Sequence, residues 1–220
     1  KYVLGRFGWK AGQPSVRAQT QAAFLTDMGL STPQHKEPWG DCTEAQTLCR
    51  NKMHGDSDSE LGIEVSEKFV DFVTFYAKNL AVPARRDVNH PQVIAGKKVF
   101  IKAGCGGCHV AKFVTRRDAE QEEHRFQLIW PYTDLLLHDM GDGLADNRHV
   151  GSANGREWRT PPLWGIGLTE MVNGHTNFLH DGRARNLLEA IIWHGGEAQE
   201  TRDIVVNLEP EKRAALIRFL

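Results

Sequence analysis

The sequence predicts an all-α fold in which helices frame long irregular loops, and three observations lead to this fold class. In several stretches apolar residues recur at steps of three and four, the spacing of one helix face. Residues 110–179 hold only short apolar bursts, and so much irregular chain in a compact domain usually wraps a cofactor or builds a site. A C-x-x-C-H pentapeptide occupies residues 105–109, at the end of one of the helical stretches.

The pentapeptide is the attachment signature of a c-type haem. In such a site Cys105 and Cys108 add to the two vinyl groups of one porphyrin, and His109 is the proximal ligand of the iron. Gly106 and Gly107 allow a tight turn against the flat macrocycle. The alternatives are a structural C-x-x-C bridge and half a zinc site, and the sequence shows no second ligand pair at zinc spacing. The sequence therefore predicts a cytochrome c-like domain that binds haem c covalently and wraps it with long irregular loops.

Composition indicates which kinds of partner the protein could bind and where in the cell it could be located. The chain has 220 residues, 40% of them hydrophobic, which suffices for one good-sized core or two small domains. With 27 basic and 28 acidic side chains, nothing favours a nucleic-acid partner, and no apolar run approaches the ~20 residues of a membrane span. Haem attachment of this type takes place outside the cytoplasm, so we expect a periplasmic or exported protein. Because the chain starts without methionine and has no signal segment, we expect a processed product or a piece of a longer protein.

Residues 1–40 have too little apolar surface for a domain, and residues 1–62 are predicted to be a connecting segment. They include one short helical pattern, Val16 to Met28, which closes at Gly29. Cys42 and Cys49 bracket six residues of a polar loop, and we expect a local disulfide worth about 2 kcal/mol. Metal binding or thiol catalysis by this pair is the alternative, for which the neighbouring residues offer nothing that lowers a thiol pKa.

Four further helices are predicted after this segment, one of which ends at His194. Apolar side chains between Glu64 and Leu80 recur at helical spacing, and Pro83 stops the pattern. A second helix, residues 92–103, leads into the pentapeptide and carries Gly96, which makes a close helix crossing feasible. The expected partner in that crossing is the last helix, residues 210–220, which begins with a proline at a favoured first-turn position.

On the residues alone, the sixth ligand of the iron is open between a histidine and a methionine. Six-coordinate haem iron transfers electrons, whereas a five-coordinate iron leaves a position for chemistry. Leu187, Ile191 and His194 fall on one face of a predicted helix, so that an apolar stripe ends in an imidazole. Met140 lies in a glycine-rich loop with two aspartates, which could equally form a turn or a cation site. The other histidines and methionines considered are His138, Met171, His175 and His180.

Several motifs together resemble one group of haem proteins over nearly the whole chain. They are residues 131–141 (PYTDLLLHDMG), residues 159–164 (RTPPLW), residues 180–183 (HDGR) and the helix that ends at His194. These segments resemble the C-terminal haem domain of the bacterial di-haem cytochrome c peroxidases and of the methylamine-dehydrogenase maturase. The likeness is strongest to their relatives, the di-haem oxidoreductases, also called thiol oxidoreductases, of which residues 131–141 are typical.

The resemblance implies further ligands and site residues. In the peroxidases the axial methionine of the electron-transfer haem follows the histidine of the matching segment by fourteen residues. His194 follows His180 by fourteen residues, so the resemblance makes His194 the distal ligand in place of that methionine. The family's calcium is bound near the segment that matches Thr169, which makes Thr169 a calcium candidate in a loop that departs from the family's pattern. The matched segments also imply four cofactor contacts, with the two arginines as propionate partners: Arg159, Thr160, Pro161 and Arg183.

The resemblance also implies a part that lies outside this chain. The relatives carry two haems, whereas this sequence has a single C-x-x-C-H, so a second haem is expected in an N-terminal domain that precedes it. Residues 1–62 would then be the connecting edge of that N-terminal haem domain. Residues 63–220 would be the cytochrome c-like C-terminal haem domain.

Three functions are compatible with these features. The first is one half of a di-haem peroxidase-like oxidoreductase, in which this chain relays electrons from an external donor, such as a small redox protein, to a second haem that uses hydrogen peroxide. The second belongs to another class, a stand-alone monohaem electron-transfer cytochrome without catalysis. The third is a maturase-like enzyme that oxidises a partner protein through a pair of haems.

Overall fold

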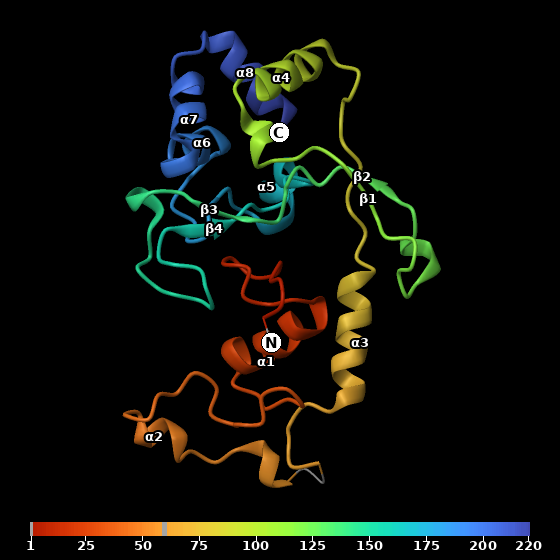
Figure 1. Cartoon of the computed structure of the whole chain (residues 1–220), viewed down its shortest axis with the longest axis vertical. Coiled ribbons are helices and arrows are strands. Elements are labelled where there is room, and N and C mark those ends of the chain that lie inside the picture. The colour runs from red at the N-terminus through yellow and green to blue at the C-terminus, as the bar shows by residue number, and fades with distance from the viewer. Residues whose placement is uncertain (1, 59–60) are drawn as a thin grey trace. The chain divides into compact units, whose positions relative to one another are not determined.

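The computed structural model describes residues 2–58 and 61–220, and these divide into two compact units (Figure 1). The first unit comprises the residues up to Gly8 together with Gly12–Ala81, and the second comprises Trp9–Ala11 and Val82–Leu220. By their contacts, residues 63–81 therefore belong with the first unit. The roles of residues 1–62 as a connecting segment and of residues 63–220 as a C-terminal haem domain stay predictions. Residues 1, 59 and 60 of the predicted connecting segment lie outside the described residues.

Two helices, α1 (Val16–Met28) and α3 (Glu67–Lys78), pack together in the first unit. The helix α1 begins where the Ser15 side chain accepts a hydrogen bond from the backbone N–H of Ala18. It ends at Gly29, which adopts a left-handed φ of 70°. These bounds confirm the sequence prediction for α1, because both of its ends are set by local signals. None of the helices in the described part of the chain has the length and apolarity that crossing a membrane requires.

Polar side chains fill much of the interior of the first unit. Gln21, Ser31 and Thr32 are at most 1% exposed. Glu64 accepts hydrogen bonds from the backbone N–H of Ser31 (2.8 Å), from its hydroxyl (3.1 Å) and from the N–H of Gly55 (2.9 Å). Burial alone would raise the pKa of Glu64, but these hydrogen bonds outweigh burial and lower that pKa. The first unit is thus organised around a buried network of hydrogen bonds.

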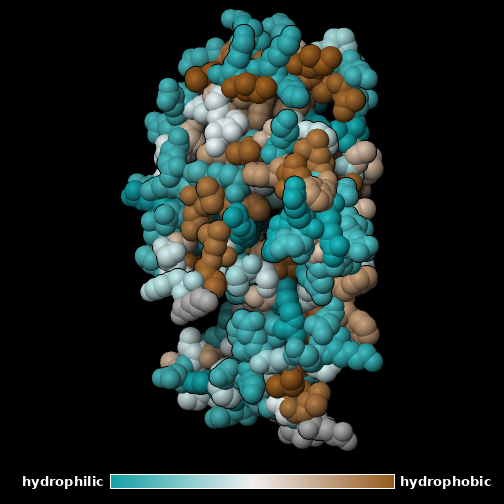
Figure 2. All heavy atoms as spheres, turned by 45° about the vertical axis from the view of Figure 1, so that its right-hand side comes forward, coloured by the Kyte–Doolittle hydropathy of each residue, from teal (hydrophilic) through white to brown (hydrophobic). Residues whose placement is uncertain are grey.

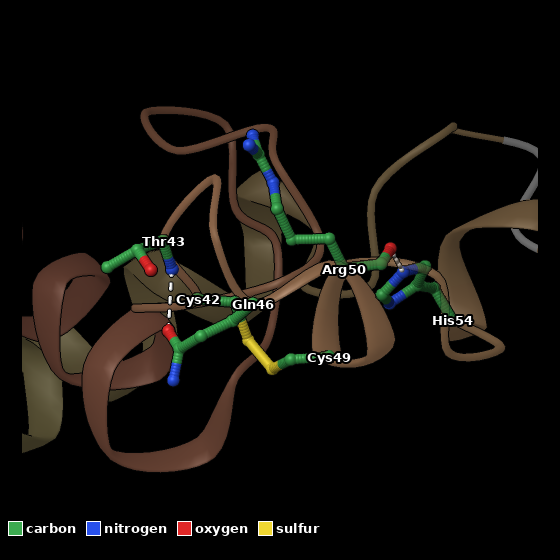
Figure 3. Close-up of a disulfide and its surroundings, with 6 residues drawn as sticks. All are labelled: Cys42, Thr43, Gln46, Cys49, Arg50 and His54. Atoms are coloured by element: carbon green, nitrogen blue, oxygen red, sulfur yellow. Dashed lines mark hydrogen bonds between the residues drawn. A yellow bond between two sulfur atoms is a disulfide. The ribbon is translucent and has the colours of Figure 1, made fainter.

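The disulfide that the sequence predicts between Cys42 and Cys49 is present (Figure 3). It joins the loop before the short helix α2 (Thr47–Arg50) to the helix itself. Within the closed loop, the backbone N–H of Thr43 donates to the side-chain oxygen of Gln46 over 2.8 Å. The crosslink therefore ties down a polar loop that buries few apolar side chains.

The second unit is built on the crossing of α4 (Pro91–Lys102) and α8 (Pro210–Phe219), which Figure 1 shows side by side. At the crossing, a Cβ on Gly96 would overlap the backbone carbonyl of Ala215. The predicted close approach of these helices at Gly96 is therefore confirmed. A cluster of buried residues surrounds the crossing: Val93, Phe100, Ala103, Tyr132, Val205, Leu216 and Phe219.

The prediction of an all-α fold is wrong. Helices make up only 40% of the chain, and within residues 2–58 and 61–220 four strands pair in two small antiparallel sheets. Strand β1 (Phe113–Val114) pairs with β2 (Leu128–Ile129), and β3 (Leu137–Asp139) pairs with β4 (Glu157–Arg159). Strands of two or three residues are too short to show the alternation of apolar and polar side chains that betrays a strand in a sequence. They form here because the backbone of long loops still needs hydrogen-bond partners.

Three shorter helices complete the second unit: α5 (Thr169–Asn173), α6 (Leu187–Ile192) and α7 (Gln199–Val206). The helix α6 begins where the Asn186 side chain accepts a hydrogen bond from the N–H of Glu189. The sequence did not predict α7, which carries only a short apolar stripe.

Apolar side chains reach the surface of the protein in several separate patches, which are the brown atoms of Figure 2.

Candidate functional site

The pentapeptide forms a 3-10 turn, Cys105–Gly107, directly after α4. Gly104 enters this turn with a left-handed φ of 94°, a conformation that favours glycine. Cys105 and Cys108 are partly buried, and neither forms a disulfide. Burial raises the pKa of the Cys105 thiol to about 11. Burial, then the charges of Asp134 and Glu197, also raise the pKa of Cys108, so both thiols are neutral at pH 7.

The His109 imidazole is fixed by the backbone of Tyr132, whose carbonyl oxygen lies 2.9 Å from His109 Nδ1. A carbonyl oxygen can only accept, so Nδ1 carries the proton and Nε2 carries the lone pair. Tyr132 is 4% exposed and has a left-handed φ of 52°, an uncommon conformation for a bulky residue that aims this carbonyl. Burial lowers the pKa of His109 to about 4, which keeps the ring neutral.

His194 follows α6 and has the same arrangement as His109. Its Nδ1 lies 2.8 Å from the carbonyl oxygen of Ala190, so Nδ1 donates and Nε2 again carries the lone pair. Burial lowers the pKa of His194, and a charge on His194 in turn lowers the pKa of His109. The charge effect of His194 on His109 indicates that the two rings share one electrostatic environment.

Met140, the other predicted ligand, lines a cleft of about 720 Å³. Trp193 and Gly195, the sequence neighbours of His194, border the same cleft, whereas His109, His194 and the two cysteines do not. The backbone of Met140 is packed against the double glycine that follows His194. A Cβ on Gly195 would lie 2.9 Å from the Met140 carbonyl oxygen, and a Cβ on Gly196 would overlap the carbonyl oxygen of Asp139. Only glycines therefore allow these two loops to touch.

The predicted cofactor contacts of residues 159–161 lie around strand β4. The N–H of Arg159 donates to the carbonyl of Trp9 over 2.8 Å, and burial lowers the pKa of the Arg159 guanidinium. Thr160 is 6% exposed, and its carbonyl accepts a 2.6 Å hydrogen bond from the Thr133 hydroxyl. Pro161 is exposed. The structure thus places Thr160 inside the fold, Arg159 partly buried and Pro161 at the surface.

Arg183 lies apart from these residues and is held by several groups. It pairs with Asp181 at 2.6 Å, donates to the carbonyl of Gly143 at 2.5 Å and lies 4.9 Å from the centre of the Trp193 ring. The contact with Trp193 places Arg183 next to the residue that precedes His194. Thr169, the calcium candidate, donates its hydroxyl hydrogen to the carbonyl of Ile166 over 2.7 Å.

Sequence reasoning missed a bridge of three charged side chains beside the pentapeptide. His138 on β3 lies between two carboxylates: its Nε2 is 2.9 Å from Asp134 and its Nδ1 is 2.8 Å from Glu197. Donor atoms of Cys108, Asp134 and His138 all lie within 4.8 Å of one another. This spacing could suit a metal ion, but an imidazole that donates from both nitrogens has no lone pair to offer. The contact of His138 with Asp134 could have been suspected, because both residues belong to the motif of residues 131–141. The contact with Glu197 is visible only in the fold, because Glu197 is distant in the sequence.

A second missed feature is a stacked column in the same unit. The rings of Trp158 and His180 stack at 3.6 Å between centroids, and the ammonium group of Lys10 lies 4.3 Å from the Trp158 ring. Lys10 is 5% exposed and pairs with Asp146 at 2.6 Å. The column fixes His180 at the start of the matched HDGR segment.

The residues at the pentapeptide fit a c-type haem. Such a group needs two thiols that are not joined in a disulfide and imidazoles that present a lone pair from a neutral ring. Cys105 and Cys108 meet the first need, and His109 and His194 meet the second. In both imidazoles a backbone carbonyl holds Nδ1, the arrangement that commonly orients metal-binding histidines.

Comparison with known proteins gives one match. A sequence model of the family described as "di-haem oxidoreductase, putative peroxidase" matches residues 1–220, the whole chain. No curated protein and no solved structure matches the chain. The match confirms the resemblance found in the motifs, and it agrees with a haem cofactor and an oxidoreductase role. This chain belongs to the di-haem oxidoreductase family.

Proposed function

We propose that this chain is the electron-transfer domain of a di-haem oxidoreductase, with one haem c attached through Cys105 and Cys108. The observation that carries the proposal is the pair of imidazoles, His109 and His194. Each ring is neutral, each holds its Nδ1 hydrogen on a backbone carbonyl, and each keeps its Nε2 lone pair for a metal. Such a pair suits an iron that is closed to substrate on both faces.

The hydrogen bond of the His194 ring favours it over Met140 as the distal ligand. A carbonyl holds Nδ1 of that ring and leaves the Nε2 lone pair for a metal, whereas Met140 lines a cleft that His109 does not border. His194, by contrast, is close enough to His109 for its charge to lower the pKa of that ring.

The chain's own residues would hold and shield the cofactor. When bound, haem c supplies one-electron chemistry at its iron. Tyr132 and Ala190 orient the two ligand rings through their carbonyl groups, and Arg159 and Arg183 are proposed to pair with the propionates. Because two nitrogen ligands leave the iron no open position, we assign the chain to electron relay and the use of hydrogen peroxide to a second haem outside it.

The remaining expectations are part of the same proposal. We propose a periplasmic or exported location, a small redox protein or another external donor as electron source, and an N-terminal haem domain of the same protein as acceptor. Residues 1–62 would connect to that domain, and calcium near Thr169 belongs to the proposal as well. These expectations rest on the attachment motif and on the family resemblance.

A second candidate is a stand-alone monohaem cytochrome. One observation favours it: the 220 residues contain a single C-x-x-C-H. The number of haems per intact gene product separates the two functions. One haem without peroxide turnover would leave only the electron carrier.

The proposal is tested by the absorption and low-temperature spin-state spectra of the protein matured with haem. We expect one covalent haem per chain and a low-spin spectrum of an iron with two histidine ligands. His194→Gly should convert the iron to high spin, and His194→Met should shift the spectrum to that of a His/Met haem. Met140→Leu serves as the control and should leave the spectrum unchanged. A colourless protein, or a low-spin spectrum that survives in His194→Gly, would overturn the assignment.

A further inference from the structure

The bridge of Asp134, His138 and Glu197 is a fixed feature of the fold. Both carboxylates are anchored a second time: Asp134 accepts the N–H of Leu136 over 2.9 Å, and Glu197 accepts the N–H of Asp139 over 2.9 Å. The side chains of Asp134 and His138 are 11% and 16% exposed, whereas that of Glu197 is 55% exposed. These second hydrogen bonds fix the position of both carboxylates in the bridge.

Hydrogen-bond stoichiometry sets the charge of the bridge. An imidazole between two carboxylates donates from both nitrogens, so the ring is an imidazolium with one positive charge. Two carboxylates and one imidazolium sum to a net charge of −1. The sum stays the same if the shared proton moves onto either carboxylate.

The bridge lies beside the proposed haem attachment. Donor atoms of Asp134 and His138 lie within 4.8 Å of Cys108 Sγ, and Cys108 precedes the proximal ligand His109. The field of the bridge reaches both residues, because Asp134 and Glu197 raise the pKa of Cys108, and Asp134 raises while His138 lowers the pKa of His109.

We propose that this anionic bridge lowers the reduction potential of the haem iron held by His109. A net negative charge near the iron stabilises the oxidised form, which carries one positive charge more than the reduced form. Because the Asp134 side chain is 11% exposed and lies beside Cys108, solvent and salt would screen its charge only weakly. The inference rests on the proposed haem site and adds the residues that set how readily that site accepts an electron.

The test is a redox titration of the haem-loaded chain at pH 5, followed in the visible spectrum, because a histidine stays protonated there even when one of its carboxylate partners is removed. Asp134→Asn then removes one negative charge while His138 keeps its positive charge, so reduction should become about tenfold more favourable, which is about 59 mV for a one-electron couple. Glu197→Gln should act in the same direction by about threefold, because Glu197 is more exposed. His138→Gln removes the positive charge and should shift the equilibrium about threefold in the opposite direction.

A matched control is Asp118→Asn. Asp118 pairs with Arg116 at 2.7 Å and its side chain is 73% exposed, so the same loss of charge should leave the potential unchanged. The opposite signs for Asp134→Asn and His138→Gln separate charge tuning from structural damage, which would shift every variant in one direction. If one carboxylate variant fails to fold, the other still has the sign opposite to that of His138→Gln, and His138→Asn takes the place of His138→Gln if that variant fails.

Two results would overturn the inference. One is a set of potentials that change no more than in the control. The other is a shift of His138→Gln in the same direction as Asp134→Asn. In either case a normal low-spin haem spectrum would show that the haem assignment itself stands, whereas a protein without covalent haem would refute the proposed function instead.

Discussion

The two compact units bury different kinds of side chain. In the first unit, the least exposed residues include Gln21, Ser31 and Thr32. The Glu64 carboxylate accepts two hydrogen bonds from Ser31. In the second unit the corresponding place is taken by an aromatic cluster around the crossing of α4 and α8, in which the Phe100 and Phe219 rings lie 5.4 Å apart. The first unit should therefore respond to pH and reductant, and the second to changes in side-chain volume.

The largest effect is expected at the helix crossing of the second unit. Gly96→Ala adds a Cβ that would overlap the Ala215 carbonyl, and a backbone atom cannot rotate away, so the free energy of unfolding should fall by about 3 kcal/mol. Hydrogen exchange measured by mass spectrometry would locate the loss in α4 and α8. Gly143→Ala is the control, because its Cβ would meet the Trp193 ring at an ordinary 3.8 Å. An unchanged exchange rate in Gly96→Ala would mean that the helices are not this close.

A smaller effect is expected from opening the disulfide. The double variant Cys42→Ser, Cys49→Ser should destabilise the first unit by about 2 kcal/mol, because the reduced loop gains conformational entropy when it unfolds. Exchange should speed up in residues 41–58 and stay unchanged in α4 and α8. A reductant added to the parent protein should have the same effect, and an equal acceleration in both units would contradict the comparison.

The smallest effect is expected at Glu64. Glu64→Gln keeps one acceptor oxygen but loses the charge that strengthens three hydrogen bonds, and should cost about 1.5 kcal/mol at pH 7. The folded-state pKa of Glu64 lies below its ordinary 4.5, so its contribution is present above pH 4.5 and is lost as the pH falls through the folded pKa. Unfolding curves between pH 3 and pH 7 should therefore converge for parent and variant at the acid end. The control is Glu67→Gln, which removes only an exposed ion pair with Arg17 and should change the free energy of unfolding by less than about 1 kcal/mol.

Features with a local signal could be predicted from the sequence. The bounds of α1 follow from Ser15 and Gly29, the crossing follows from Gly96, and the disulfide follows from the short spacing of Cys42 and Cys49. The structure confirms these three features. The attachment motif and the ligand role of His194 remain predictions, which the placement of both imidazoles supports.

Features that depend on distant pairing could not be predicted. The strands β3 and β4 are three residues each, so no periodicity marks them, and their register is set by the chain between them. Glu197 lies 59 residues from His138 in the sequence, and the identity of the two residues does not predict that they form a hydrogen bond. Without homologous sequences, a hydrogen bond between such residues becomes visible only once the fold is known.

The glycine contact behind His194 has a consequence for how the protein tolerates mutation. A Cβ at position 196 overlaps a backbone oxygen whatever the rest of the side chain is, so every missense codon there should be rejected to a similar degree. At the next position, the Glu197 side chain accepts hydrogen bonds from His138 and from the N–H of Asp139. Glutamine keeps an acceptor oxygen and should be tolerated there, whereas leucine should not. In a deep mutational scan, position 196 should therefore tolerate only glycine, whereas position 197 should tolerate polar side chains that accept hydrogen bonds.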